Sequence, residues 1–256
     1  MLIDGHTHLI PKNLPQFRQE FDRAKLDYAI VMILPSDLYL DEDKEYQLPI
    51  TPQTLETIKQ DNLKLAGLCK DNPEYLPFAW LDYRMDDAVG FLESLVEKHG
   101  FRGLKIHQVF NGPADHHYHP LVEKAIKFNI PVMIHTGFRE PARVDYVVGL
   151  AETYPEGTFI SAHMSEEYGL NKRFSHINAA KSHPNLYLEC SYISSIRRLS
   201  EAVSILGDDR ILFGSDFPLW HSNIEYSKTV VAQAPISPES KQNILGLNFK
   251  RLLKLP

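Results

Sequence analysis

The chain has 256 residues, of which 43% are hydrophobic and 23% are charged, a composition that fits a globular protein and excludes a disordered or fibrous one. Its 27 basic and 33 acidic residues give a formal net charge of -6 without a Lys/Arg-rich block, so nucleic acid is not an expected partner. No apolar run approaches the roughly 20 residues that span a bilayer, and the first residues do not resemble a signal peptide. We therefore expect a cytoplasmic protein with no membrane contact that acts on a small-molecule substrate.

Short apolar, β-branched runs recur at about the interval of one βα unit, and a stretch with helical periodicity follows each of them. The predicted strands, in chain order, are Leu2–Gly5, Tyr28–Leu34, Leu76–Asp82, Gly103–His107, Pro131–Thr136, Thr158–His163, Leu186–Cys190 and Arg210–Ser215. Apolar strands that alternate with helices need a parallel sheet covered by helices, and eight such units close most naturally into a (β/α)8 TIM barrel. We predict one α/β barrel domain over residues 1–256. An open doubly wound sheet is the alternative, but no Gly-x-Gly-x-x-Gly follows an early strand to support its dinucleotide-binding form.

Two of the predicted helices run from Asp87 to Lys98 and from Pro120 to Phe128, and in each the apolar residues lie on one side. The first runs into Gly100 and the second into Asn129, both of them residues that commonly end a helix. The segment from Pro35 to Pro52 shows no clear periodicity and is expected to be an insertion after the second strand.

Polar side chains gather where the predicted strands end, and in a barrel the active site lies there because the loops after the strands converge. Histidines two apart on an extended strand point to the same face, so His6 and His8 can bind one ion together. The other strand ends carry Lys105, His107, His135, His163 and Asp216. Imidazole and carboxylate ligands suit zinc, manganese or iron, and Cys69 and Cys190 lie outside this set. A single histidine is more often a core residue, but this joint placement favours a metal-dependent active site.

Four segments carry a resemblance to a known family. They are Ile3–His8, Gly103–His107, Pro131–Gly137 and Leu212–Pro218. Together they resemble the amidohydrolase superfamily, in the branch called amidohydrolase 2 or amidohydrolase-related, whose members include aminocarboxymuconate semialdehyde decarboxylase. The resemblance covers nearly the whole chain, and the segment Asn243–Leu252 is similar to the closing helix of that branch.

The resemblance implies a metal-dependent barrel enzyme. In that family pattern one divalent ion, zinc first with manganese or iron as alternatives, is bound by His6, His8, His135 and Asp216, and His163 is the nearby acid or base. Some branches carry a carboxylated lysine on the fourth strand, but the Gly-x-Lys-x-His form around Lys105 looks like the mononuclear branch.

The family spans two kinds of reaction. Our first hypothesis is a hydrolase that activates water on the ion to attack the carbonyl of an amide, lactone or ester, with Asp216 taking the water proton and His163 stabilising the oxyanion. The second is non-oxidative decarboxylation of an aromatic or unsaturated carboxylic acid, in which His163 protonates the carbon that loses carbon dioxide. An acidic substrate needs binding groups, and Arg139, Lys105 and His107 are the candidates.

Two other classes stay open. TatD-type deoxyribonucleases also carry His-x-His on the first strand, but Phe213–Pro218 fits the amidohydrolase form better. A non-catalytic metal-binding or scaffold protein would bind the ion without turning over any substrate.

Three further features have structural interpretations. Glu189 lies near the predicted mouth of the barrel, and we interpret it as the partner of a neighbouring arginine or lysine. The cluster Asp115–His119 is expected to be a solvated loop rather than a second metal site. Helices on the wall of such barrels often mediate homodimers, which is the base expectation for the oligomeric state.

Overall fold

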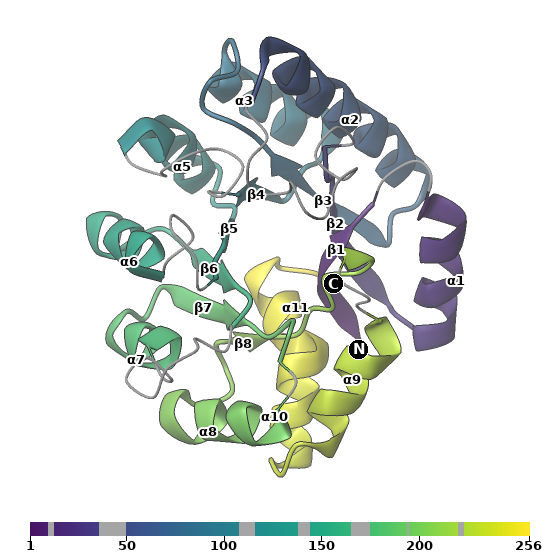
Figure 1. The fold of residues 1–256 in the computed structure, drawn as a ribbon, viewed down its shortest axis with the longest axis vertical. Helices are drawn as coiled ribbons and strands as arrows, with labels where there is room; N and C mark the ends of the chain where they lie inside the picture. Colours follow the sequence, from purple (N-terminus) through teal and green to yellow (C-terminus); the bar gives the residue numbers. More distant parts are fainter. Residues whose placement is uncertain are drawn as a thin grey trace.

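A computed structural model of the chain shows eight parallel strands in the order β1 to β8, with helices around the outside (Figure 1). The structure describes residues 1–9, 13–35, 50–107, 116–137, 144–164, 175–193, 195–219 and 223–256. The strands are β1 (Ile3–His8), β2 (Tyr28–Met32), β3 (Tyr75–Trp80), β4 (Gly103–Ile106), β5 (Val132–His135), β6 (Phe159–Ala162), β7 (Leu186–Glu189) and β8 (Ile211–Leu212). This arrangement confirms the predicted (β/α)8 TIM barrel.

The helices mostly alternate with the strands along the chain. They are α1 (Leu14–Ala24), α2 (Pro52–Asp71), α3 (Ala88–His99), the 3-10 turn η2 (His116–Tyr118), α5 (His119–Lys127), α6 (Val144–Thr153), α7 (Ser175–Ser182), α8 (Ile196–Leu206), α9 (Ile224–Gln233), α10 (Pro238–Gln242), the π-helical turn η4 (Asn243–Leu247) and α11 (Asn248–Leu252). Figure 1 shows most of them as an outer ring around the strands. Each strand is therefore covered on its outer face, as continuous apolar strands require.

The predicted strands and helices match the observed elements closely, with differences at the first and last strands. β1 extends to His8, beyond the predicted end at Gly5, and β8 ends at Leu212, before the predicted Ser215. Helix α3 ends as expected at Gly100, which adopts the left-handed conformation (φ 72°) that glycine tolerates. Most of the expected insertion after the second strand, residues 36–49, lies outside the described residues.

Separate backbone hydrogen bonds connect β1 to the segment after β8. The Asp216 N–H donates to the His6 carbonyl over 2.7 Å, and the His8 N–H donates to the Phe217 carbonyl over 2.7 Å. A ladder of two residues in β8 could not close the barrel alone, so these bonds bring the two ends of the sheet together. They also place two predicted metal ligands on adjacent backbone.

The buried carboxylate of Asp4 reinforces this closure. Its Oδ1 accepts the backbone N–H groups of His6 (3.1 Å) and Ser215 (2.9 Å). Burial raises the pKa of the Asp4 carboxyl to about 7, although the hydrogen bonds with His6 and Ser215 oppose that shift. The side chain thus ties β1 to the segment that carries Asp216.

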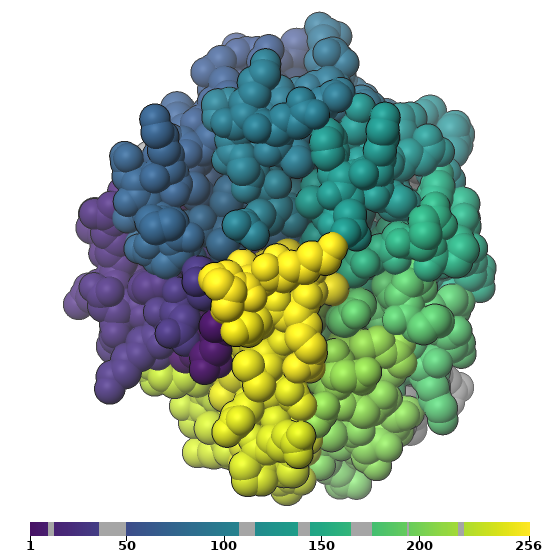
Figure 2. All heavy atoms as spheres, turned by 180° about the vertical axis from the view of Figure 1, so that it is seen from behind, coloured from purple at the N-terminus to yellow at the C-terminus, as the bar shows by residue number. Residues whose placement is uncertain are grey.

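Two layers of apolar side chains make up the core. The larger layer lies between the strands and the surrounding helices. The smaller one fills the barrel interior, where Ile3 and Leu76 pack with Phe249, Leu253 and Leu255 from the end of the chain. Figure 2 shows the C-terminal segment, in yellow, crossing the middle of the rear face. The amino ends of the strands are therefore covered by the chain itself, and the polar strand ends lie at the opposite end.

Both cysteines of the chain, Cys69 and Cys190, are buried free thiols, which agrees with their apolar sequence contexts. Among the described helices, none has the length and apolar character that a bilayer crossing requires.

We expect Gly5→Ala to destabilise the barrel. A Cβ at this position would lie 1.9 Å from Phe249 Cε2 and 2.7 Å from the backbone oxygen of Phe213, so the closure would have to shift. Overpacking of this kind costs about 1–3 kcal/mol of unfolding free energy, measured by urea denaturation. The matched control is Gly67→Ala on α2, where a Cβ meets no atom within 4 Å. Alanine inside a helix should raise the unfolding free energy by about 0.5–1 kcal/mol relative to glycine. Equal effects of the two substitutions would contradict the steric argument.

Candidate metal centre

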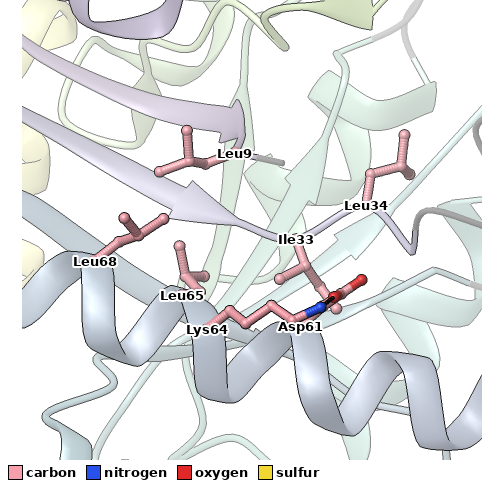
Figure 3. Close-up of a pocket in the computed structure, with 7 residues that line it drawn as sticks. All are labelled: Leu9, Ile33, Leu34, Asp61, Lys64, Leu65 and Leu68. Atoms are coloured by element: carbon pink, nitrogen blue, oxygen red, sulfur yellow. Dashed lines mark hydrogen bonds and ion pairs between the residues drawn. The ribbon is translucent and has the colours of Figure 1, made fainter. Parts of the chain in front are cut away.

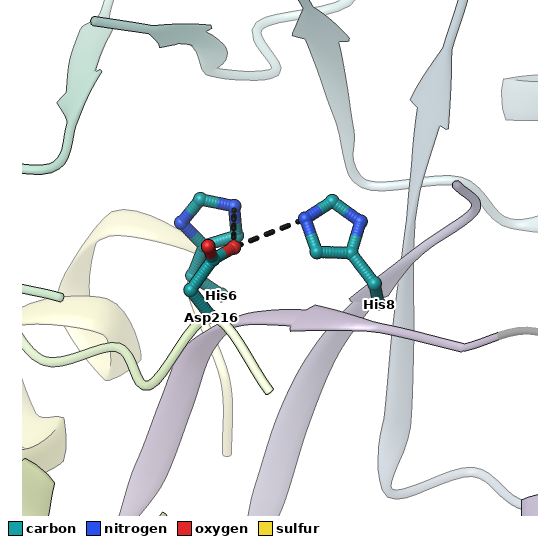
Figure 4. Close-up of side chains that lie close together, drawn as sticks. All are labelled: His6, His8 and Asp216. Carbon is teal, nitrogen blue, oxygen red and sulfur yellow. Dashed lines mark hydrogen bonds and ion pairs between the residues drawn. The ribbon is translucent and has the colours of Figure 1, made fainter. Parts of the chain in front are cut away.

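Three predicted ligands meet at the carboxyl ends of β1 and β8. His6 and His8 lie on β1 and Asp216 lies four residues after β8, and all three side chains are buried. Asp216 Oδ1 lies 3.0 Å from His6 Nε2 and 3.1 Å from His8 Nε2, so both rings point at one carboxylate oxygen (Figure 4). One ligand atom from each residue falls within 4.8 Å of the others, which is the separation of ligands around one metal ion.

The hydrogen bonds of the two rings leave these three side chains oriented so that they could hold a cation. His6 Nδ1 donates to Glu189 Oε2 (2.9 Å), and His8 Nδ1 donates to the Ile33 carbonyl (3.1 Å). A neutral imidazole with its proton on Nδ1 carries its lone pair on Nε2. Two lone pairs therefore face the acceptor oxygen of Asp216, and such a group of acceptors needs a positive charge among them. Nitrogen and carboxylate donors with oriented imidazoles fit a divalent ion such as zinc or manganese.

The charge and backbone of Asp216 are consistent with a ligand role. Burial opposes ionisation of this carboxyl, but His6, His8 and Lys105 outweigh it and lower its pKa. The carboxylate is therefore the stable form near neutral pH. Asp216 also has a φ of 59°, a left-handed conformation that costs free energy for a residue with a side chain and that clusters at functional sites.

Lys105 on β4 brings a positive charge into the same cluster. Its side chain is fully buried, and its Nζ lies 3.2 Å from His6 Nε2. Burial lowers the pKa of this amine to about 8, against the opposing effects of Asp216 and Glu189. The sequence predicted Lys105 as a substrate-binding residue, and the structure places it beside the candidate ligands.

His163 and His135 form the neighbouring part of the site. His163 follows β6, has a φ of 64°, and stacks on the His6 ring with centroids 4.9 Å apart. Its Nε2 lies 3.1 Å from Nδ1 of His135, the last residue of β5. His135 is therefore adjacent to the group of His6, His8 and Asp216 but is not one of the three atoms that converge.

Aromatic stacking holds His135 from the other side. The His107 ring lies 3.9 Å from the His135 ring at 16°, and Trp80 stacks on the far side of His107 at 5.3 Å and 23°. His107 and Trp80 are buried, and burial lowers the pKa values of both His107 and His135. The predicted substrate-binding residue His107 thus forms part of the wall of the site.

Glu189, which the sequence suggested as the partner of an arginine or lysine, is hydrogen-bonded to histidines. Its fully buried Oε2 accepts from His6 Nδ1 (2.9 Å), the His163 backbone N–H (3.1 Å) and Ser191 Oγ (2.8 Å). Burial raises the pKa of this carboxyl, and the hydrogen bonds to it and the charge of Lys105 oppose that shift. One feature of the sequence could have revealed this role. Glu189 and Ser191 lie at alternate positions where the seventh strand ends, and such residues share a face.

Glycine at position 214 makes room for this carboxylate. A Cβ on Gly214 would lie 2.3 Å from Glu189 Oε1 and 2.8 Å from the Cβ of His6. The close approach of the backbone after β8 to β7 and β1 therefore excludes any side chain there.

A family model described as amidohydrolase matches residues 3–255. The chain belongs to the amidohydrolase family. No curated protein matches the chain. Because this family model covers β1 and the segment after β8, the candidate metal centre lies within the matched region.

Solved structures with the same fold match nearly the whole amidohydrolase chain. A 2,6-dihydroxybenzoate decarboxylase from Rhizobium is 18% identical, with a TM-score of 0.74 over 99% of this chain and 98% of its own. A dihydroxybenzoic acid decarboxylase from Polaromonas sp. JS666, solved with manganese and the inhibitor 2-nitroresorcinol, is 20% identical, with a TM-score of 0.74 over 99% and 97%. A 5-carboxyvanillate decarboxylase from Sphingomonas paucimobilis is 14% identical, with a TM-score of 0.73 over 100% and 99%. At these identities the likeness shows the fold.

Two further predictions from the sequence concern Arg139 and the cluster Asp115–His119. Arg139 lies outside the described residues. The histidine cluster ends in η2 and at the start of α5, where His117 stacks on Tyr83 and His119 Nδ1 bonds to the Tyr154 hydroxyl. Within the described parts of the chain, the groups of side chains able to hold a metal include none of these cluster histidines.

A pocket of different character lies beside α2 (Figure 3). Its lining residues are Leu9, Ile33, Leu34, Asp61, Lys64, Leu65 and Leu68. Asp61 is paired with Lys64 at 2.9 Å, so the mainly apolar lining offers no unbalanced charge. Among the described residues, the groups able to hold a metal lie in the histidine-rich centre and not in this pocket.

We expect the purified amidohydrolase to carry about one equivalent of a divalent metal per chain. The double substitution His6→Ala/His8→Ala removes two of the three converging donors and should abolish that metal in elemental analysis. His183→Ala is the matched control, because this histidine bonds to Glu152 on the surface. Metal retained in the double variant, or two equivalents in the unmodified protein, would contradict a single ion at this position.

We also expect the metal-free protein to lose stability on acidification. Burial lowers the pKa of His176 to about 3 from 6.5. Between these two pH values the unfolded chain binds a proton that the folded protein does not, so the unfolding free energy falls by up to about 1.4 kcal/mol per pH unit for such a histidine. Urea denaturation with a chelator from pH 7 to pH 4 measures the slope. His176→Gln should make it shallower, and an unchanged slope would contradict the assignment.

Proposed function

We propose that this amidohydrolase is a metal-dependent decarboxylase that removes carbon dioxide, without oxidation, from an aromatic or unsaturated carboxylic acid. The observation that carries the proposal is the likeness, over almost the full length of both chains, to decarboxylases of aromatic acids, one of them solved with manganese. The cluster of His6, His8 and Asp216 supports it, because these residues fit the divalent ion that such a reaction uses.

The three converging residues would hold the ion, with His135 as the adjacent predicted ligand. A divalent ion bound there supplies Lewis-acid stabilisation of negative charge on the substrate oxygens. Glu189 and the Ile33 carbonyl accept the Nδ1 protons of His6 and His8, so the protein holds both rings with Nε2 toward that ion.

His163 is the residue that would deliver the proton. The bond between the substrate carbon and its carboxylate breaks, the electron pair stays on that carbon, carbon dioxide leaves, and a proton from His163 Nε2 bonds to the carbon. Burial lowers the pKa of His163, so the ring is neutral in the free protein. The negative charge of a bound acid acts in the opposite direction and favours the protonated ring.

Lys105 and Tyr192 would orient the carboxylic acid substrate. The buried Lys105 amine lies next to His6 and provides the positive charge that an incoming carboxylate needs. Tyr192 is 39% exposed and its ring centroid lies 5.0 Å from that of His163, so an aromatic ring lies beside the residue that would protonate a planar substrate. His107 acts by stacking against His135 and so maintains the wall of the site.

We expect the metal-loaded protein to release carbon dioxide from one or more hydroxybenzoic or unsaturated acids. In deuterated water the carbon that lost the carboxylate should gain one deuterium, which NMR detects. His163→Asn should lower kcat by about 100-fold or more, since a positioned acid contributes that much. His183→Asn, on the surface beside Glu152, should retain full activity.

The same protein is also assayed with amides, esters and lactones, which test the hydrolase hypothesis at this site. Turnover of these compounds without carbon dioxide release would overturn the proposed decarboxylase. Metal binding without turnover of any compound would favour the non-catalytic alternative.

A further inference from the structure

We infer that Glu189 and Ser191 are positioning residues for His163: they hold its ring with the proton on Nδ1, so that Nε2 is the atom that exchanges a proton with the substrate. The inference rests on the proposed function and deepens it. It concerns residues that bond to the proton donor His163 and not to the substrate.

The direction of the hydrogen bonds follows from counting protons. Ser191 Oγ donates its only proton to Glu189 Oε2 over 2.8 Å. Its contact with His163 Nδ1, at 2.7 Å, must then be one in which the ring donates and the hydroxyl accepts. The proton of the neutral ring is therefore on Nδ1, and the lone pair is on Nε2.

The unprotonated nitrogen of His163 points toward the candidate metal centre. Its Nε2 lies 3.1 Å from His135 Nδ1, and its ring stacks on His6. If the proton were on Nε2 instead, Glu189 Oε2 and His163 Nδ1 would compete as acceptors for the one hydroxyl proton of Ser191. One of these two contacts would then bring two acceptors together in a buried site without a proton between them, which is costly.

Glu189 also fixes the backbone at His163. Its Oε2 accepts the His163 N–H at 3.1 Å, and the N–H of Ser191 donates to its Oε1. His163 and Tyr192 have φ values of 64° and 58°, so this region adopts conformations that the surrounding contacts must maintain. One carboxylate therefore holds both the main chain and, through Ser191, the ring of His163.

The same oxygen of Glu189 accepts from His6 Nδ1. Both rings consequently have their protons on Nδ1 and their lone pairs on Nε2, one as a candidate ligand and one as the acid. During turnover Ser191 keeps its hydroxyl proton, Glu189 remains an acceptor, and only the proton on His163 Nε2 is transferred to carbon. Loss of Ser191 should thus affect the acid while leaving the ligand set intact.

The test compares Ser191→Ala, which removes the acceptor, with Ser191→Thr, which retains the hydroxyl. The control is Ser161→Ala, because Ser161 is another buried serine that bonds to a histidine Nδ1, at His176. We expect Ser191→Ala to keep its metal and to hold KM within about threefold while kcat falls by about 10-fold or more. Ser191→Thr should recover most of kcat, and Ser161→Ala should leave kcat unchanged.

Nitrogen-15 NMR of histidine-labelled, metal-free protein gives a readout independent of activity. The His163 resonances, assigned by their loss in His163→Asn, should show the proton on Nδ1 in the unmodified protein and a mixture of tautomers in Ser191→Ala. Glu189→Gln should also perturb them, together with those of His6.

Several outcomes would overturn the inference. A proton on Nε2 of His163 in the unmodified protein would do so, as would a change of tautomer in Ser191→Ala with unchanged kcat. A fall in kcat that matches the loss of bound metal would indicate a structural effect only. If no acid is decarboxylated by the unmodified protein, the proposed function fails, and the NMR measurement still decides whether Ser191 sets the ring.

Discussion

The carboxylate of Glu189 is the buried charge around which the mouth of the barrel is organised. It accepts hydrogen bonds from a side chain on β1, from the backbone after β6 and from both polar groups of Ser191 after β7. A charge removed from water is tolerated when it is fully hydrogen-bonded. The requirement to satisfy this one group orients His6, fixes His163 and excludes a side chain at Gly214.

The barrel was predictable because buried parallel strands are continuous apolar runs whose spacing survives in the sequence. Its closure was harder to predict. His6 and His8 are polar and lie beyond the predicted end of the first strand at Gly5, yet both belong to β1 because they meet other polar groups instead of water. β8 is short because the chain beyond Leu212 is joined to β1 by separate backbone hydrogen bonds and not by a continuous ladder.

The site was predictable to the extent that its residues stand at strand ends. His6, His8 and Asp216 were expected together and are found together, whereas His135 lies one contact away beside His163. The role of Glu189 could not be read from composition, since a carboxylate near lysines and arginines looks like an ion-pair partner. Only the three-dimensional arrangement shows that its hydrogen bonds set the proton positions of two imidazoles.

The packing of Phe249, Leu253 and Leu255 into the barrel interior limits how small molecules can enter and leave the site. Because the C-terminal segment covers the amino ends of the strands (Figure 2) and side chains fill the space between, no passage runs through the part of the barrel that the structure describes. A small molecule that reaches the histidine centre therefore arrives and departs on the same side, at the carboxyl ends of the strands. Reactant and product share one route, and each occupies the space that the other needs.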